Sequence, residues 1–427
     1  MNIVTVFSLF GGLGLFLYGM KLMSEALEKA AGAKMRSILE FFTKNRLMGT
    51  IVGIIFTAII QSSNATTVMV VSFVNSGLMT LAQASGVIMG ANIGTTVTAQ
   101  LIAFNLSDIA PLFVIIGVIM VMFCKPLKVK RFGEVILGFG ILFMGLTTMS
   151  SSMVAFRESP TIVNFLSSLH NHTLAILTGF VLTAVLQSSS ATVGIILLMA
   201  TQGLLELPMC FFMILGCNIG ACMSAMLVSL SGRKEAKQAA WIHFLFNIIG
   251  SLVIYIVLSL ALDPITDWLY AFSGNDIGRA VANAHTLIKV IEVIMMFPFM
   301  NLIVKATYKI VPGTDEDQVE GHELMYINLN KVLSPTTALV DVLHEIKRMG
   351  NMAIENLQDG MEALLNCDEE KVAKVKETEK VINFLNEAIT SYLIKVNQLD
   401  LPMADADLLG GLYHVVNDLE RVGDHAE

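Results

Sequence analysis

Charged residues are scarce in this sequence. Only 15% of its 427 residues are Asp, Glu, Lys or Arg, whereas soluble domains carry about 25%. Residues 1–311 hold 18 basic and 12 acidic residues, whereas residues 312–427 hold 9 and 23. A single soluble domain is therefore excluded, and the chain divides near Pro312 and Gly313 into an apolar part and an acidic part. The acidic balance also argues against nucleic-acid binding, which needs a basic surface.

Cysteine is also rare, and its distribution excludes two classes of site. Four of the five cysteines lie in or beside apolar segments, which is not a disulfide framework. Cys217 and Cys222 lack the spacing of a zinc pair and have no histidine nearby. No set of nucleophile and base stands out in the apolar part, so the sequence does not indicate an enzyme. The first apolar segment, residues 3–20, lacks the basic start and the cleavage site of a signal peptide and is expected to be a membrane helix.

Apolar stretches are abundant, but several are too short for the ~20 residues that span a bilayer. The short stretches flank polar segments. The sequence QSSN (61–64) separates stretches 47–60 and 65–78, and QSSS (187–190) separates 173–186 and 191–205. The stretches 81–104 and 207–230 contain GANIGTT and GCNIGAC. This pattern predicts an all-α, polytopic membrane protein with broken or re-entrant helices.

These interruptions repeat at a constant offset of 126 residues. Between positions 53 and 94 we count 16 identities with positions 179–220, and they include Gln61, Ser62 and Ser63 against Gln187, Ser188 and Ser189. Apolar composition alone would not align glutamine, serine and asparagine. The sequence therefore predicts an internal duplication, with a first repeat at about 5–124, a second at about 134–262 and a final helix at 286–311.

Basic residues set the expected orientation. They gather in the regions 21–46, 125–131, 231–237 and 305–309, which should face the cytoplasm. The two repeats then cross the membrane in opposite directions, so they are predicted to be inverted. We expect a multi-pass protein of the inner (plasma) membrane, with its N-terminus outside and residues 312–427 in the cytoplasm.

Matching breaks in two inverted repeats point to the binding site of a transporter. Helix N-termini and hydroxyl or amide groups can hold an oxyanion, and the same hydroxyls with amide oxygens can ligate a cation. Residues 47–107 contain no charge and residues 173–230 contain only Glu206. A buried anion needs a positive partner, which co-bound sodium would supply. The substrate candidates are Ser62, Ser63, Asn64, Ser188, Ser189 and Ser190, and the sodium candidates are Gln61, Thr66, Asn92, Thr95, Gln187, Thr192 and Asn218.

Two other interpretations stay open at this point. Serine, threonine and glycine in membrane helices often serve close helix packing, and Gly12, Gly14 and Gly19 fit that role. Asn92 and Asn218 could cap a broken helix. The chain could also be a membrane-anchored sensor of the ion it binds, or an anion channel.

The QSSNATT and QSSSATV segments, together with GANIGTT and GCNIGAC, resemble the type II sodium–phosphate cotransporter family over about residues 5–310. That resemblance implies sodium-driven import of inorganic phosphate, with both ions bound where the two QSS segments meet. It singles out Gln61, Ser62, Ser63, Gln187, Ser188 and Ser189. The lipid bilayer, phosphate and sodium are the expected partners, and we also expect a homodimer. The sodium stoichiometry and the discrimination against arsenate or sulfate are not legible from these motifs.

Residues 321–366, 369–398 and 404–427 are expected to form amphipathic helices of a soluble bundle. The segment NDLERVGDHAE (417–427) resembles the ERxGD signature of PhoU-type domains, in which acidic positions can bind metal and the domain regulates phosphate uptake. Glu420 and Asp424 share one helix face, which makes them candidates for a divalent metal site, although a solvated face with Arg421 is the plainer interpretation. The chain stops inside this helix, so we expect a truncated PhoU-like domain at 312–427.

Overall fold

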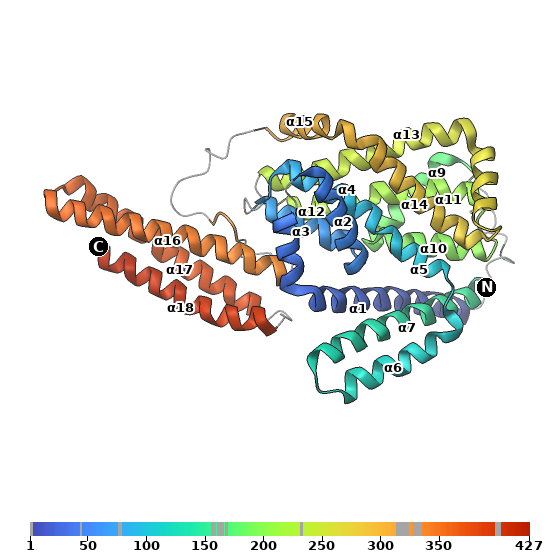
Figure 1. Cartoon of the computed structure of the whole chain (residues 1–427), viewed down its shortest axis with the longest axis horizontal. Helices are drawn as coiled ribbons and strands as arrows, with labels where there is room; N and C mark the ends of the chain where they lie inside the picture. The colour runs from blue at the N-terminus through green and yellow to red at the C-terminus, as the bar shows by residue number, and fades with distance from the viewer. Residues whose placement is uncertain are drawn as a thin grey trace. The chain divides into compact units, whose positions relative to one another are not determined.

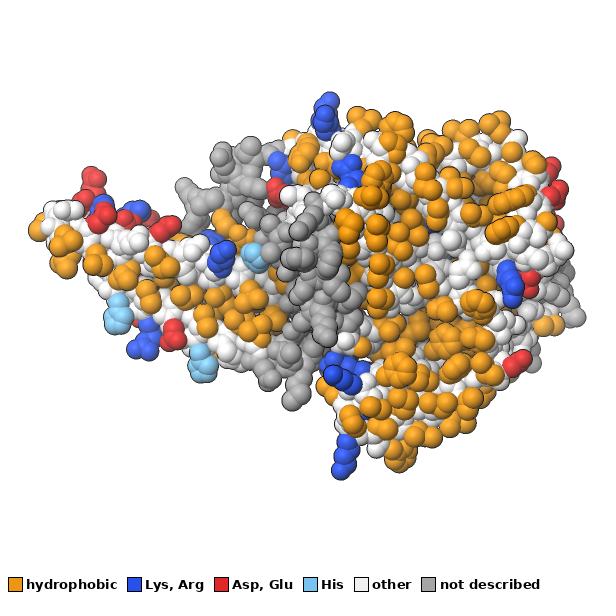
Figure 2. Space-filling model, in the orientation of Figure 1, with side chains coloured by type: hydrophobic (Ala, Val, Ile, Leu, Met, Phe, Trp, Pro, Cys, Tyr) orange, Lys and Arg blue, Asp and Glu red, His pale blue; other side chains and the backbone are white. Residues whose placement is uncertain are grey.

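A computed structural model describes residues 3–42, 45–75, 79–154, 159, 166, 170–230, 234–312, 324–327, 335–397 and 403–427. All regular structure in these ranges is helical (Figure 1). Within the described ranges, six helical stretches are long and apolar enough to cross a membrane. Large apolar side chains such as Phe7, Met122 and Leu260 are exposed on the outside of this part, and Figure 2 shows apolar atoms over most of the visible surface of the helices before residue 311. Such a surface suits lipid and not water.

Contacts divide the chain into two units. The first comprises Met1–Val70, Thr80–Leu230 and Lys237–Ile310, and the second comprises Val71–Met79, Ser231–Ala236 and Val311–Glu427. The helices up to residue 153 are α1 (Ile3–Phe42), α2 (Arg46–Ile60), α3 (Ser63–Asn75), α4 (Leu81–Gly94), α5 (Thr96–Ala103), η1 (Ser107–Ile109), α6 (Ala110–Phe123) and α7 (Leu127–Met153). The next are α9 (His172–Leu186), α10 (Ser189–Thr201), α11 (Leu207–Gly220), α12 (Cys222–Ser229), α13 (Lys234–Phe272), α14 (Ile277–Met296), η3 (Phe297–Phe299) and α15 (Met300–Ile310).

The helix breaks at both QSS segments are confirmed. Gln61 follows α2 with φ 61° and Gln187 follows α9 with φ 51°, so both glutamines adopt the left-handed conformation that ends a helix. The new helices α3 and α10 then begin at Ser63 and Ser189. Each QSS segment is therefore a sharp turn between two half-length helices.

The breaks expected at GANIGTT and GCNIGAC are much slighter. Thr95, between α4 and α5, has φ −63° and ψ −21°, and Ala221, between α11 and α12, has φ −60° and ψ −26°. Both pairs of angles are helical. Leu81–Ala103 and Leu207–Ser229 therefore each form one 23-residue stretch that is long enough to span a bilayer.

The glycines of these two segments serve close packing. A Cβ on Gly90 would lie 2.0 Å from the carbonyl oxygen of Thr50, and a Cβ on Gly216 would lie 2.0 Å from that of Ile176. Thr50 and Ile176 are themselves 126 residues apart, so α4 packs on α2 as α11 packs on α9. Only glycine permits main chains to approach so closely.

Helices α1 and α7 pack against one another in opposite directions. A Cβ on Gly12 would meet the carbonyl oxygen of Gly145, and a Cβ on Gly19 would meet that of Gly138. Gly12 and Gly138 are equivalent under the 126-residue offset, as are Gly19 and Gly145. The predicted packing role is borne out by these contacts for Gly12 and Gly19, whereas Gly14 has no atom within 4 Å of a Cβ.

Two helical stretches extend beyond the ranges expected from the sequence. The first membrane helix was expected at residues 3–20, but α1 continues through the basic region to Phe42 because no proline or strained turn interrupts its sequence. The final helix was expected at 286–311. Instead α14 begins at Ile277, where Asp276 accepts a hydrogen bond from the main-chain nitrogen of Arg279 as its N-cap, and α15 follows a short 3₁₀ turn at Pro298.

The second unit contains α16 (Pro335–Asn366), α17 (Glu369–Asn397) and α18 (Met403–Ala426). Its apolar core includes Leu339, Val342, Ile346 and Met349 of α16, as expected of an amphipathic helix. The expected start of this first helix at 321 and the predicted boundary at Gly313 lie outside the described residues.

Candidate functional site

The two QSS segments line one cavity of about 410 Å³. At about 30 Å³ per water molecule, this volume holds on the order of ten waters. It is therefore large enough for small ions with part of their hydration shell. The lining contains eight of the predicted site residues, which are Gln61, Ser62, Ser63, Asn64, Gln187, Ser188, Ser189 and Ser190.

Each QSS segment is built by the same set of local hydrogen bonds. The hydroxyl of Ser62 accepts from the main-chain nitrogen of Ala65 at 3.2 Å, and Ser188 accepts from that of Ala191 at the same distance. These two serines therefore act as N-caps of α3 and α10. Gln61 and Gln187 form the turns through their left-handed main chain, and the second serine of each pair begins the new helix.

Thr66 and Thr192 lie behind the turns and do not line the cavity. Thr66 Oγ1 bonds the hydroxyl of Thr57 at 2.8 Å and donates to the carbonyl oxygen of Ser62 at 2.9 Å. Thr192 makes the equivalent bonds, to Thr183 at 3.0 Å and to Ser188 at 3.1 Å. Both side chains hold the two half-length helices together, and their role as sodium ligands stays a prediction.

Direct hydrogen bonds join the two QSS segments. Asn64 Nδ2 donates to the carbonyl oxygen of Gln187 and, at 3.1 Å, to the hydroxyl of Ser224 on α12. Thr95 Oγ1 donates to Ser63 Oγ at 3.2 Å and lies 3.4 Å from Ser190 Oγ. Thr95 thus bridges both segments, although it does not itself line the cavity.

Charged residues of α1 complete the lining, and they were not predicted as site residues. Lys21, Glu25 and Glu28 line the cavity, and Lys21 Nζ lies 3.6 Å from a carboxylate oxygen of Glu25. Both side chains of this pair are well exposed, at 70% and 47%. Because the first helix was expected at residues 3–20, nothing in the sequence connected these charges with the QSS segments.

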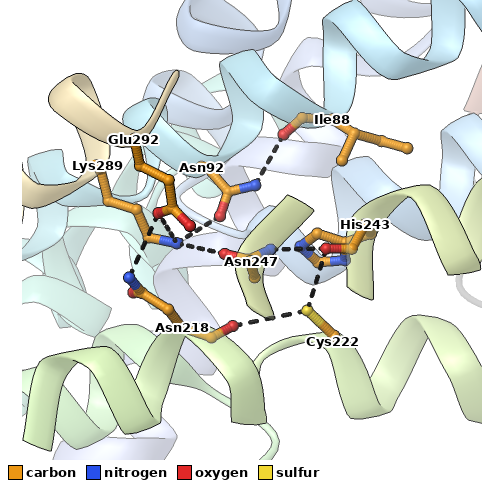
Figure 3. A network of polar contacts seen from close by, with 8 residues as sticks. All are labelled: Ile88, Asn92, Asn218, Cys222, His243, Asn247, Lys289 and Glu292. Carbon is orange, nitrogen blue, oxygen red and sulfur yellow. Dashed lines mark hydrogen bonds and ion pairs between the residues drawn. The ribbon is translucent and has the colours of Figure 1, made fainter. Parts of the chain in front are cut away.

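A second group of charges is buried beside the site, in the membrane-spanning part (Figure 3). Lys289 and Glu292 of α14 are only 2% and 0% exposed, and Lys289 Nζ lies 3.7 Å from Glu292 Oε2. Lys289 also donates to the side-chain oxygens of Asn92 at 2.5 Å and Asn247 at 2.8 Å. The signal that could have identified them is two opposite charges one helical turn apart in an apolar helix.

Asn92 and Asn218 therefore face this group and do not line the cavity. Asn92 Nδ2 donates to the carbonyl oxygen of Ile88, and its Oδ1 accepts from Lys289. Asn218 Nδ2 donates to Glu292 Oε2 at 3.4 Å. The sodium-binding role of both asparagines stays a prediction.

The acidic candidates of α18 lie near a third carboxylate. Glu379 of α17 is buried, accepts from Asn356 Nδ2 at 3.5 Å and would meet a Cβ placed on Gly423. Burial, and then the negative charges of Asp424, Glu427 and Glu420, raise the pKa of Glu379 to about 7. Among the described residues, no three His, Cys, Asp or Glu side chains form a group that could hold a metal ion.

Comparison with known families matches most of this chain. Residues 15–151 and 156–303 match the Na⁺/Pi-cotransporter family, and residues 346–427 match the PhoU domain. The chain belongs to the Na⁺/Pi-cotransporter family. It is therefore a multi-pass membrane protein of phosphate transport that carries a PhoU domain, and it is not an enzyme.

Individual relatives are similar over different parts of the chain. The protein of Salmonella typhimurium named "Putative inorganic phosphate export protein YjbB" is 25% identical over 99% of this chain and 77% of its own length. YqeW of Bacillus subtilis is 30% identical over 70% of this chain and 95% of its own length. Rat sodium-dependent phosphate transport protein 2A is 38% identical over 22% of this chain and 15% of its own length. No solved structure matches this chain.

The site combines neutral oxygen and nitrogen groups with few fixed charges. Serine hydroxyls can donate to an oxyanion or coordinate a cation, and glutamine can present either atom of its amide. The arrangement suits reversible binding of small ions.

Proposed function

We propose that this protein is a sodium-coupled symporter of inorganic phosphate, and that both ions bind in the cavity between the QSS segments. The observation that carries this proposal is the convergence of Gln61–Asn64 and Gln187–Ser190 on one cavity. These segments lie 126 residues apart in the chain and are joined there by Asn64 and Thr95. Such convergence is expected of a binding site and has no purpose in simple helix packing.

The charges of the lining support sodium coupling. Lys21 is the basic side chain of the lining, and it is paired with Glu25. Among the described side chains of the lining, a phosphate anion meets two carboxylates and one ammonium, so these fixed charges alone do not favour it. Co-bound sodium ions offset the anion's charge, and each ion then lowers the electrostatic cost of binding the other. In this proposal the serines and Asn64 hold phosphate, while Gln61 and Gln187, whose amides line the cavity, are the first sodium ligands to test.

The proposal includes two inverted repeats. The antiparallel contacts of Gly12 with Gly145 and of Gly19 with Gly138 support it, because equivalent positions contact one another reciprocally, as they do about a two-fold axis. The matching contacts of Gly90 and Gly216 support it further. We keep the orientation given by the basic regions, with the N-terminus outside and the PhoU domain in the cytoplasm, where the domain would regulate transport.

Phosphate export is a second candidate, favoured by the name of the export-protein relatives that match 99% of this chain. Coupling and direction are separate questions. A symporter moves phosphate whichever way the summed gradients of sodium and phosphate point, so an inward sodium gradient gives import. Net export would require sodium to leave with phosphate, or a phosphate pathway that does not depend on sodium.

Purified protein in liposomes tests these candidates. We expect uptake of labelled phosphate with sodium outside and choline inside, and little uptake when choline replaces sodium on both sides. Vesicles loaded with phosphate and sodium should release phosphate when external sodium is removed. Equal rates with and without sodium, in either direction, would contradict symport. A rate that does not saturate with phosphate would indicate a channel, and binding without flux would indicate a sensor.

A further inference from the structure

Helix α14 lies outside both predicted repeats, but it contacts equivalent residues of the two. Its Lys289 bonds Asn92 of α4, and its Glu292 bonds Asn218 of α11. Asn92 and Asn218 are equivalent under the 126-residue offset. Figure 3 shows these residues around the ion pair, with Asn247 of α13 on the third side. Asn92 thus accepts a hydrogen bond through its side-chain oxygen, whereas Asn218 donates one through its side-chain nitrogen.

The buried ion pair is closely fitted. Lys289 has three donor hydrogens, and its ammonium faces Asn92 Oδ1, Asn247 Oδ1 and Glu292 Oε2. Asn247 Nδ2 donates to the carbonyl oxygen of His243 at 3.0 Å, which turns its oxygen toward Lys289. Gly250 leaves room for the carboxylate, since a Cβ there would lie 2.2 Å from Glu292 Oε1. Charges buried in an apolar helix are costly, so their presence there indicates a function.

Short helical segments connect this ion pair to the cavity. Asn92 lies three residues before Thr95, which bonds Ser63 and approaches Ser190. Asn218 lies six residues before Ser224, which accepts from Asn64. Each segment held by the ion pair therefore contacts the QSS segment of the opposite half.

We propose that Lys289 and Glu292 are a positioning pair, which fixes α4–α5 and α11–α12 relative to one another and so sets the spacing of the QSS segments. This inference rests on the proposed transport function where phosphate uptake is measured. A cross-linking measurement between the QSS segments tests it without transport. The pair touches neither phosphate nor sodium. It acts through Asn92 and Asn218 on the residues that line the cavity.

The test removes both charges together. Lys289→Met alone leaves Glu292 buried and unpaired, so that single variant should not fold well. The double variant Lys289→Met/Glu292→Leu leaves no unpaired charge, and such neutral replacements are often tolerated. We expect it to be recovered as folded protein, with a phosphate concentration for half-maximal uptake at least tenfold higher than that of the parent. The maximal rate per folded molecule should change much less. The control is Asn301→Ala, which removes a polar contact to Arg46 at the opposite end of α2 from Gln61.

A cross-linking measurement gives the structural readout without phosphate. The variant Thr95→Cys/Ser190→Cys places two thiols where the hydroxyls lie 3.4 Å apart, and disulfide geometry is strict. We expect the disulfide to form at least tenfold more slowly when the double variant is added. An unchanged half-saturation value together with an unchanged cross-linking rate would overturn the positioning role. Failure of the parent protein to transport phosphate would instead refute the proposed function, and the cross-linking result would still decide this inference.

Discussion

Thr95 is the residue whose replacement should most directly separate the two QSS segments. Its hydroxyl donates to Ser63 at 3.2 Å and lies 3.4 Å from Ser190, and its side chain is 3% exposed. Thr95→Val keeps the branched shape of the side chain and removes the hydroxyl. The two segments then lose the bridge between them, while the helix around residue 95 keeps its packing.

The expected magnitude follows from the lost hydrogen bonds. Each bond contributes about 0.5–1.5 kcal/mol, so the two together contribute about 1–3 kcal/mol. At 1.4 kcal/mol per factor of ten, this free energy corresponds to a rise of about 5- to 100-fold in the phosphate concentration for half-maximal uptake. The prediction assumes that the bridge stabilises the binding-competent spacing, and the same liposome assay measures it at saturating sodium.

The adjacent residue provides a matched control. Thr96 is equally buried at 3%, but its hydroxyl donates to the carbonyl oxygen of Ile93 within its own helical stretch at 2.8 Å. Thr96→Val should therefore leave the half-saturation value within about twofold of the parent, because it breaks no contact between the QSS segments. Equal effects of both variants would refute the bridging role of Thr95 and would indicate a general effect of valine on this stretch.

Four further predictions address other parts of the chain. Ser62→Ala and Ser188→Ala should each weaken the apparent affinity for phosphate or sodium by about 10- to 100-fold, and together non-additively. Gly90→Ala should abolish recovery of folded protein in size-exclusion chromatography, since its Cβ would meet a carbonyl oxygen at 2.0 Å. Removal of the residues after Pro312 should leave sodium-dependent uptake intact and change its rate or control. Glu379→Gln should raise the local free energy of unfolding of α17 and α18 at pH 8 by about 1–2 kcal/mol, which slower hydrogen exchange would show.

The sign for Glu379 follows from its raised pKa. The folded state favours the protonated carboxyl, so stability is greatest below the unfolded pKa of about 4.5 and falls as pH rises toward about 7. Glu379→Gln should remove that dependence of stability on pH, and an unchanged dependence would contradict the raised pKa of Glu379.

Controls for the serine and glycine variants come from the same chain. For the serines the control is Ser150→Ala, because Ser150 bonds Gln202 away from the cavity. For Gly90 the control is Gly11→Ala, which meets nothing within 4 Å.

The QSS segments could be located from the sequence because their signal is local and duplicated. Polar residues between two short apolar stretches leave few conformations other than a turn, and Gln61 and Gln187 adopt the same left-handed geometry. The GANIGTT segment also interrupts an apolar stretch with glycine and polar residues, but these residues serve helix packing and not a turn. Gly90 and Gly94 are needed for contact with α2, so glycine and asparagine there do not mark a broken helix.

Other parts of the site depend on contacts that the sequence does not contain. Lys21 and Glu25 reach the cavity only because α1 continues as a helix beyond its apolar stretch. Lys289 lies 197 residues from Asn92, and nothing in either segment predicts that they meet. Opposite charges in an apolar helix indicate a function, but only the fold identifies the asparagines as their partners.

The buried ion pair also makes the two halves of the site chemically different. Asn92 presents its oxygen to Lys289, so an ammonium already occupies that acceptor. Asn218 presents its nitrogen to Glu292, and its oxygen has no hydrogen-bond partner among the described residues. Of these two equivalent sodium candidates, Asn218 therefore has the available ligand atom. A duplicated sequence thus does not imply duplicated ion sites, because α14 contributes a positive charge to one half and a negative charge to the other.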